Sequence, residues 1–283
     1  MELFRGLAIL AEPPTPASIP IAEALELGPL PDSTEYTDLF TFQLYPFASV
    51  YLGVEGMLGG EAADRIAGFW RALGQTPPAE ADHLSVMLAL YARLADLEEN
   101  ESDVVHRARW QNARKAFLWE HLLSWLPVYL SKMIDIAQPF YRNWSEVLRT
   151  ALFEEAQTLG IQEQISRHLR ESEGLVDPRV GDSGEFLQSL LSPARSGMIL
   201  VRSDLSRAAK RLGLGMRMGE RKFVIKSLFS QDPRGVLDWL VEEANKWILR
   251  HRVGIDALGE TAMVWENRAA TSAVLLGDLR MTS

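Results

Sequence analysis

Three short segments between residues 45 and 127 decide the fold of this chain: Tyr45–Tyr51 (YPFASVY), Glu80–Leu84 (EADHL) and Phe117–Pro127 (FLWEHLLSWLP). Each combines aromatic side chains with a residue that starts or stops a helix. Residues 53–60 between the first two contain four glycines, which break the chain there. The three segments are therefore expected at the ends of separate helices.

Apolar residues recur every three or four positions after the second segment, which predicts an amphipathic helix. Asp82 is expected to be its N-cap, because an aspartate there accepts a hydrogen bond from the first turn. A second repeat predicts one long helix from about Ser102 through Trp125. Pro127 is expected to start the next helix, since proline is tolerated at first helical positions.

The same helical period continues through the rest of the chain. The longest run that resembles a strand is Met198–Val201, and no internal repeat is present. The sequence therefore predicts an all-α protein, a multi-helix bundle with an additional helical C-terminal region. Gly, Asp and Pro become frequent between residues 174 and 184, and residues 159–161 offer a second boundary. We expect a helical core at 1–160 and a helical extension at 161–283.

Composition excludes several classes of protein. The 283 residues carry a net charge of −9 and include no cysteine, so disulfides, thiolate metal sites and cysteine nucleophiles are ruled out. The negative charge argues against general affinity for nucleic acid. No apolar stretch reaches the ~18 residues of a membrane span, and residues 1–11 lack the basic start of a signal peptide. We expect a cytoplasmic protein that holds no metal or cofactor.

Taken together, the segments resemble the TorD/DmsD family of redox-enzyme maturation chaperones. The resemblance rests on a first helix that ends at Pro13-Pro14, Leu39-Phe40 in a helix that ends before Pro46, and the three segments above, and it covers residues 1–160. Ala81 stands where the family usually has proline. The resemblance implies an all-α cytoplasmic chaperone that is not an enzyme. Its partner would be the catalytic subunit of a molybdenum-cofactor oxidoreductase or that subunit's twin-arginine leader, held until cofactor insertion.

The resemblance also implies a leader-binding groove. Arginine suits a carboxylate because its planar fork pairs both oxygens, so Glu80 and Asp82 are expected to meet the two arginines. Aromatic residues would line an apolar trough. The residues alone permit a plainer interpretation, in which Asp82 only caps a helix, His83 lies exposed in its first turn and the aromatics pack in the core. The predicted leader-binding residues are Tyr45, Pro46, Tyr51, Trp70, Glu80, Asp82, His83, Tyr91, His121 and Trp125.

The extension contains a basic segment at residues 193–226, with nine basic and two acidic residues. One hypothesis is that it packs against the acidic body of the protein. A second is a DNA-binding regulator, because residues 203–229 read as helix, glycine-containing turn and helix. A third is a site for a phosphate-bearing ligand. Nucleic acid is the less favoured partner because the chain as a whole is acidic.

Overall fold

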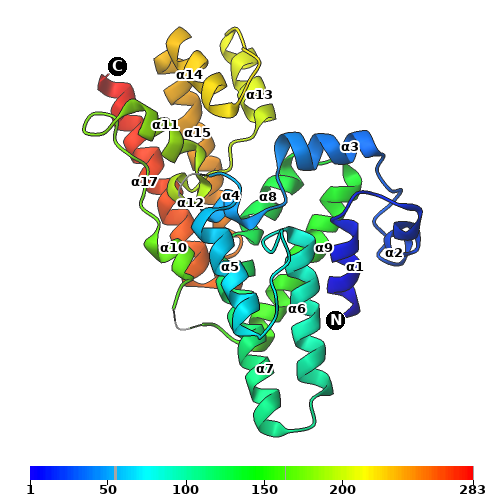
Figure 1. The fold of residues 1–283 in the computed structure, drawn as a ribbon. Coiled ribbons are helices and arrows are strands. Elements are labelled where there is room, and N and C mark those ends of the chain that lie inside the picture. Colours follow the sequence, from blue (N-terminus) through cyan, green and yellow to red (C-terminus); the bar gives the residue numbers. More distant parts are fainter. Residues whose placement is uncertain (54–55, 163, 283) are drawn as a thin grey trace. The chain divides into compact units, whose positions relative to one another are not determined.

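The computed structural model describes residues 1–53, 56–162 and 164–282, and helices joined by loops make up this part of the chain (Figure 1). No β-strand occurs within those ranges, so the predicted all-α fold is confirmed. The possible short strand at Met198–Val201 does not form. These residues form a buried, extended connection between two helices, and a run of four has no neighbouring strand with which to pair.

The described residues divide into two compact units. The first comprises residues 1–49 and 58–168, and the second comprises residues 50–57 and 169–283. Helices α4 (Ala48–Leu52) and α10 (Arg167–Glu171) each contain residues of both units. The second unit therefore includes a short segment from the first fifth of the sequence, which no local pattern indicates.

The first unit contains most of the helices that precede residue 160. Its α-helices are α1 (Glu2–Leu10), α2 (Ile19–Ala24), α3 (Ser33–Thr37), α5 (Gly60–Ala72), α6 (Leu84–Asn100), α7 (Val104–Phe117), α8 (Leu126–Ile136) and α9 (Pro139–Leu159). One 3-10 turn, η1 (Pro16–Ser18), and two π-helical turns, η2 (Asp38–Gln43) and η3 (Leu118–Leu122), complete the unit.

Helix α6 is the centre of the first unit, in contact with both α1 and α7. Its apolar repeat is buried along its whole length, at Leu84, Met87, Leu88, Tyr91, Leu94 and Ala95. Trp144 of α9 is also fully buried, and its indole nitrogen donates to the carbonyl of Leu7, 3.1 Å away. Burying such a side chain stabilises the fold by about 1.5–3 kcal/mol, and the hydrogen bond satisfies its polar atom.

The long helix expected from Ser102 through Trp125 is instead α7 followed by η3, which ends at Leu122. Helix α7 begins after Asp103, whose carboxylate accepts from the backbone N–H of His106. After Phe117 the backbone widens into η3, and a new helix begins at Leu126, with Pro127 in its first turn. The apolar spacing continues through η3, which is why the sequence pattern did not show the interruption. Single π-helical turns of this kind occur frequently at functional sites.

The second unit is built around two long antiparallel neighbours, α15 (Pro233–Arg252) and α17 (Glu260–Thr282). Asp232 caps α15 by accepting from Gly235 N–H at 2.9 Å, as Asp-Pro predicts. Trp247 and Trp265 are buried between the two helices, on either side of His251. The remaining helices are α11 (Ser183–Leu191), α12 (Pro193–Ser196), α13 (Arg202–Leu212), α14 (Arg221–Gln231) and α16 (Ile255–Leu258).

Candidate functional site

The structure brings the first two sequence segments together. Phe47 and His83 face each other in an isolated antiparallel bridge. Leu84 N–H donates to the carbonyl of Pro46 at 2.8 Å, and Ala48 N–H donates to the carbonyl of Asp82 at 3.0 Å. The rings of Phe47 and His83 meet edge to face, with centroids 4.9 Å apart. Two loops distant in sequence thus form one small, hydrogen-bonded cluster.

Asp82 does not cap α6, which corrects the expectation from the sequence. Its carboxylate accepts from the backbone N–H of Ser49 at 3.1 Å, in the first turn of α4. A negative charge there is favourable, because the first N–H groups of a helix have no partner within it. The side chain is therefore buried, and it holds the segment that follows Pro46 against the start of α6.

His83 is the actual N-cap of α6, and its Nδ1 accepts from Ser85 N–H at 3.3 Å. The plainer interpretation placed this ring in solvent, and that is wrong, because only 8% of the side chain is exposed. Ser85 Oγ donates to Glu12 Oε1, which also lies 3.7 Å from His83 Nδ1. Glu12, half exposed, was not among the predicted site residues. It stands just before Pro13, and nothing local indicates a partner more than seventy residues away.

His121 lies in the core, on the π-helical turn η3. Its ring contacts Phe69 and Phe117 at centroid distances of 5.4 and 5.5 Å, and His168 at 5.6 Å. Its Nδ1 is buried and has no hydrogen-bond partner among the described residues. Burial, followed by the charges of His168 and Arg65, lowers the pKa of His121 to about 3. The ring is therefore a neutral core group at physiological pH.

Replacing His121 by leucine is expected to make the protein less sensitive to acid. Below the ordinary histidine pKa of 6.5, the unfolded chain binds a proton that the folded chain does not, so stability falls as the pH drops toward 3. The free energy of unfolding falls by at most about 1.4 kcal/mol for each pH unit in this range, and no loss is expected above pH 6.5. Urea denaturation followed as a function of pH measures it. The exposed His106, replaced by leucine, is the control, and equal acid slopes for His121→Leu and the parent would contradict the assignment.

Tyr91 is buried in a polar cluster of the first unit. Its hydroxyl donates to Glu155 and accepts from Arg114 Nε at 3.2 Å. Arg114 also pairs with Glu155 and, at 2.9 Å, with Glu98. Burial raises the pKa of the Tyr91 hydroxyl, and the neighbouring carboxylate of Glu155 adds to the effect. Burial alone would lower the pKa of Arg114, but its hydrogen-bonded partners raise it. Tyr91 thus has a structural role that its place in an apolar repeat does not show.

The predicted leader-binding residues differ widely in exposure. Tyr45 and Glu80 are exposed, and Trp70 is partly exposed, with an indole nitrogen that is buried and has no partner among the described residues. Trp125 is fully buried and donates to the carbonyl of His121 at 2.9 Å. Tyr51 is buried in the second unit, whereas the others belong to the first. The buried members of the set are Pro46, Tyr51, Asp82, His83, Tyr91, His121 and Trp125.

Comparison with known proteins gives a family for the part of the chain that holds this site. The family model described as the nitrate reductase delta subunit matches residues 21–130. The curated proteins named chaperone protein TorD from Vibrio vulnificus strains YJ016 and CMCP6 are each 33% identical over 108 residues, which is 36% of this chain. These matches confirm the resemblance of residues 21–130 to the TorD/DmsD family. The chain spans only half the length of these curated relatives.

The TorD-family match includes every predicted leader-binding residue and leaves out Glu12, Glu155 and the basic segment. Among the residues that the structure describes, no helix is long and apolar enough to cross a membrane. Within the same ranges, no group of three or more His, Cys, Asp and Glu side chains is placed to hold a metal ion.

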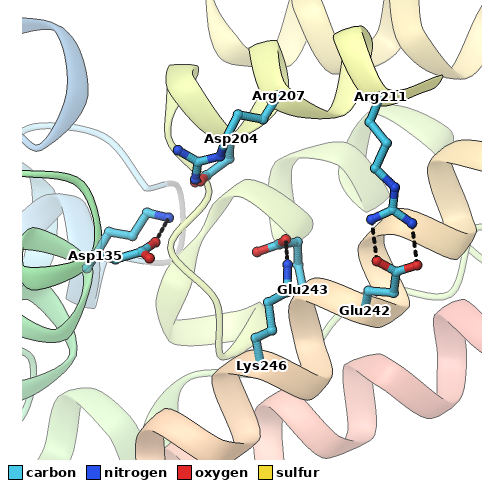
Figure 2. Close-up of polar contacts among 8 residues, drawn as sticks. Asp135, Asp204, Arg207, Arg211, Glu242, Glu243 and Lys246 are labelled. Carbon is cyan, nitrogen blue, oxygen red and sulfur yellow. Dashed lines mark hydrogen bonds and ion pairs between the residues drawn. The ribbon is translucent and has the colours of Figure 1, made fainter. Parts of the chain in front are cut away.

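The basic segment outside the TorD-family region has carboxylate partners within the second unit. Figure 2 shows Arg207 beside its partner Asp204. It also shows Arg211 donating to both carboxylate oxygens of Glu242, and each of these two bonds is 2.5 Å long. Arg195 pairs with Glu173 at 3.4 Å. Helices α13 and α14 are joined by residues 213–220, which is longer than the three or four residues of a helix-turn-helix. This geometry does not favour the DNA-binding hypothesis.

Proposed function

We propose that this protein is a cytoplasmic chaperone for a molybdenum-cofactor oxidoreductase. It would bind the twin-arginine leader, the apo form of the catalytic subunit, or both, and hold them for cofactor insertion, without catalysing a reaction. The observation that supports this most is the 33% identity to proteins named chaperone protein TorD, over a region that contains all the candidate residues. Specific leader binding is the part of the proposal that requires its own test.

Exposure divides the proposed site into residues that touch the leader and residues that shape the surface. Glu80 and Glu12 carry the carboxylates open to solvent around the Phe47–His83 bridge, and Tyr45 offers an exposed ring. We propose that the carboxylates of Glu80 and Glu12 meet the arginines of the leader, because exposed carboxylates accept the planar guanidinium in a bidentate manner. Asp82 is buried and supports them by fixing the start of α4 beside His83.

Affinity in this proposal comes mainly from apolar contact with the leader. Burying ~300 Å² of apolar surface contributes roughly 7 kcal/mol, at about 25 cal/mol per Å². Ordering a flexible peptide costs about 2–5 kcal/mol, and an exposed ion pair returns at most about 1 kcal/mol. The leader alone is therefore expected to bind no tighter than micromolar, with the carboxylates providing selectivity for arginine.

The test is titration of a labelled twin-arginine peptide into Glu80→Gln and Asp82→Asn variants. Glu80→Gln removes an exposed charge and is expected to weaken binding about 3- to 5-fold, the value of one exposed pair. Asp82→Asn keeps an oxygen that can accept from Ser49 N–H but removes the buried negative charge. It is expected to weaken binding less than Glu80→Gln does, and any loss of affinity reports the charge of Asp82 rather than its hydrogen bond. The same peptide with lysine in place of both arginines should bind more weakly to the parent.

Glu146, an exposed carboxylate on α9, gives the control variant Glu146→Gln, which should bind like the parent. If neither Glu80→Gln nor Asp82→Asn changes the affinity, and lysine peptides bind equally, the carboxylate assignment is wrong. If the parent protein binds no leader peptide but does bind the mature subunit, the mature subunit is the partner and the leader is not.

A further inference from the structure

The end of the second unit that carries α13 and α14 exposes cations beside apolar side chains. We call the set Arg202, Arg217, Met218, Lys222, Phe223 and Lys226 the basic tip. Met218 is 78% exposed and Phe223 is 46% exposed. Two contacts link them to charged neighbours: Arg202 Nη2 lies 3.3 Å from the Met218 sulfur, and the Arg217 guanidinium lies over the Phe223 ring at 5.9 Å. The basic tip is thus a local arrangement of alternating charge and apolar surface.

The core of the second unit does not account for these side chains. Helix α14 buries a different face, formed by Val224, Ile225 and Leu228. Lys222 and Lys226 lie one turn apart on the exposed side, where neighbouring positions four residues apart share a face. Met218 and Phe223 are thus left on the surface beside these cations.

The charge of the basic tip is not neutralised locally. Residues 205–226 contain seven basic residues and one acidic residue, Glu220. Arg207 and Arg211 have carboxylate partners, but Lys222 donates only to an amide, that of Gln188, at 3.1 Å. Among the described residues, no carboxylate pairs with Arg202, Arg217 or Lys226. A partner that brings negative charge would complement this surface.

We propose that the basic tip docks the protein on an anionic lipid surface. Cations there attract acidic headgroups, while Met218 and Phe223 enter the boundary between headgroups and acyl chains. A nucleic acid fits the same observations less well. Arg217 lies over one face of the Phe223 ring, so a base that stacked on that face would have to displace it, and the methionine offers a base no hydrogen bond. This inference does not depend on the proposed chaperone function.

The experiment is co-sedimentation of the full-length chain with vesicles. Vesicles of equal parts phosphatidylglycerol and phosphatidylcholine should bind the protein, and vesicles of phosphatidylcholine alone should not. Because exposed charges are screened within about 10 Å at 0.1 M salt, binding should weaken as salt is added. The double variant Lys222→Glu with Lys226→Glu should lower the partition coefficient about tenfold or more.

A second variant tests the apolar contribution without changing charge. Met218→Ser with Phe223→Ser should also reduce binding to the anionic vesicles, most clearly at high salt, where the charges contribute least. Arg71→Glu with Arg109→Glu, at two exposed positions of the first unit, makes the same change in net charge as the lysine variant and should bind like the parent. All positions are on the surface, and circular dichroism would establish that each variant is folded.

Three outcomes would overturn the proposal. The parent could bind both kinds of vesicle equally or neither kind. The control variant could lose as much binding as the basic-tip variant, which would make the effect one of net charge. Lastly, the parent could bind a single-stranded oligonucleotide, and the basic-tip variants could lose that binding while their vesicle binding stays unchanged. The basic tip would then be a nucleic-acid-binding surface.

Discussion

Gly197→Ala is expected to destabilise the second unit by about 3–5 kcal/mol, enough to unfold much of it at room temperature. A Cβ atom at residue 197 would lie 2.3 Å from the backbone nitrogen of Ala269 and 2.8 Å from its Cα. Those atoms belong to the backbone of α17, which cannot move aside as a flexible side chain would. The φ angle of Gly197 is +74°, a conformation that also disfavours alanine.

The close approach at Gly197 holds the C-terminal end of α12 against α17. The carbonyl of Gly197 is hydrogen-bonded to His251 Nε2 at 2.8 Å, and Ser272 Oγ donates to the carbonyl of Ser196 at 2.8 Å. Separating the two backbones to admit a methyl group would strain both bonds and open a close-packed junction. The cost is therefore expected to exceed that of backbone conformation alone.

Gly213 provides a matched control, because its φ angle is +68° and a Cβ there would meet nothing within 4 Å. Gly213→Ala should cost only the ~1–2 kcal/mol of a left-handed non-glycine residue. Hydrogen exchange of amides in α15 and α17 reports the second unit by itself, which avoids treating a two-unit chain as two-state. Equal loss of protection in the two variants would show that the contact with Ala269 is not limiting.

Helices could be predicted from the sequence where neighbouring residues determine where they begin and end. The apolar repeat of α6 is buried as predicted, and Asp232 followed by Pro233 begins α15 where expected. These features need only a period of 3.6 and a local cap, so a few adjacent residues determine them. The start of α6 was predicted one residue early, because Asp82 and His83 both offer a side-chain acceptor. Which of them caps α6 depends on Ser49, more than thirty residues away.

The candidate site was less predictable, because long-range pairs build it. The resemblance to a family identified segments around Pro46, Asp82 and His83, and the structure joins them through one bridge. Glu12 could not be found in this way, since only the fold places it near Ser85. An apolar repeat also gives no sign that Tyr91 is hydrogen-bonded. Its role becomes apparent only when α7 and α9 bring Arg114 and Glu155 to its hydroxyl.

Arg114→Met is expected to cost about 3–5 kcal/mol of stability in the first unit, the range measured when one partner of a buried ion pair is removed. The arginine joins α7 to Glu98 of α6 and Glu155 of α9, and 11% of its side chain is exposed. Methionine nearly fills the same volume, so the packing changes little. What changes is that two carboxylates, each 16% exposed, lose their shared cation.

Two comparisons separate this loss of charge from other effects of Arg114→Met. In urea denaturation, Arg107→Met should cost less than about 1 kcal/mol, because Arg107 is exposed and donates only to the carbonyl of Glu101. Adding Glu155→Gln to Arg114→Met should restore part of the stability, since the double variant leaves one fewer unpaired charge. If the two substitutions instead add without coupling, the carboxylate of Glu155 is solvated in the folded state, and Arg114 stabilises the unit through packing and its hydrogen bond to Tyr91.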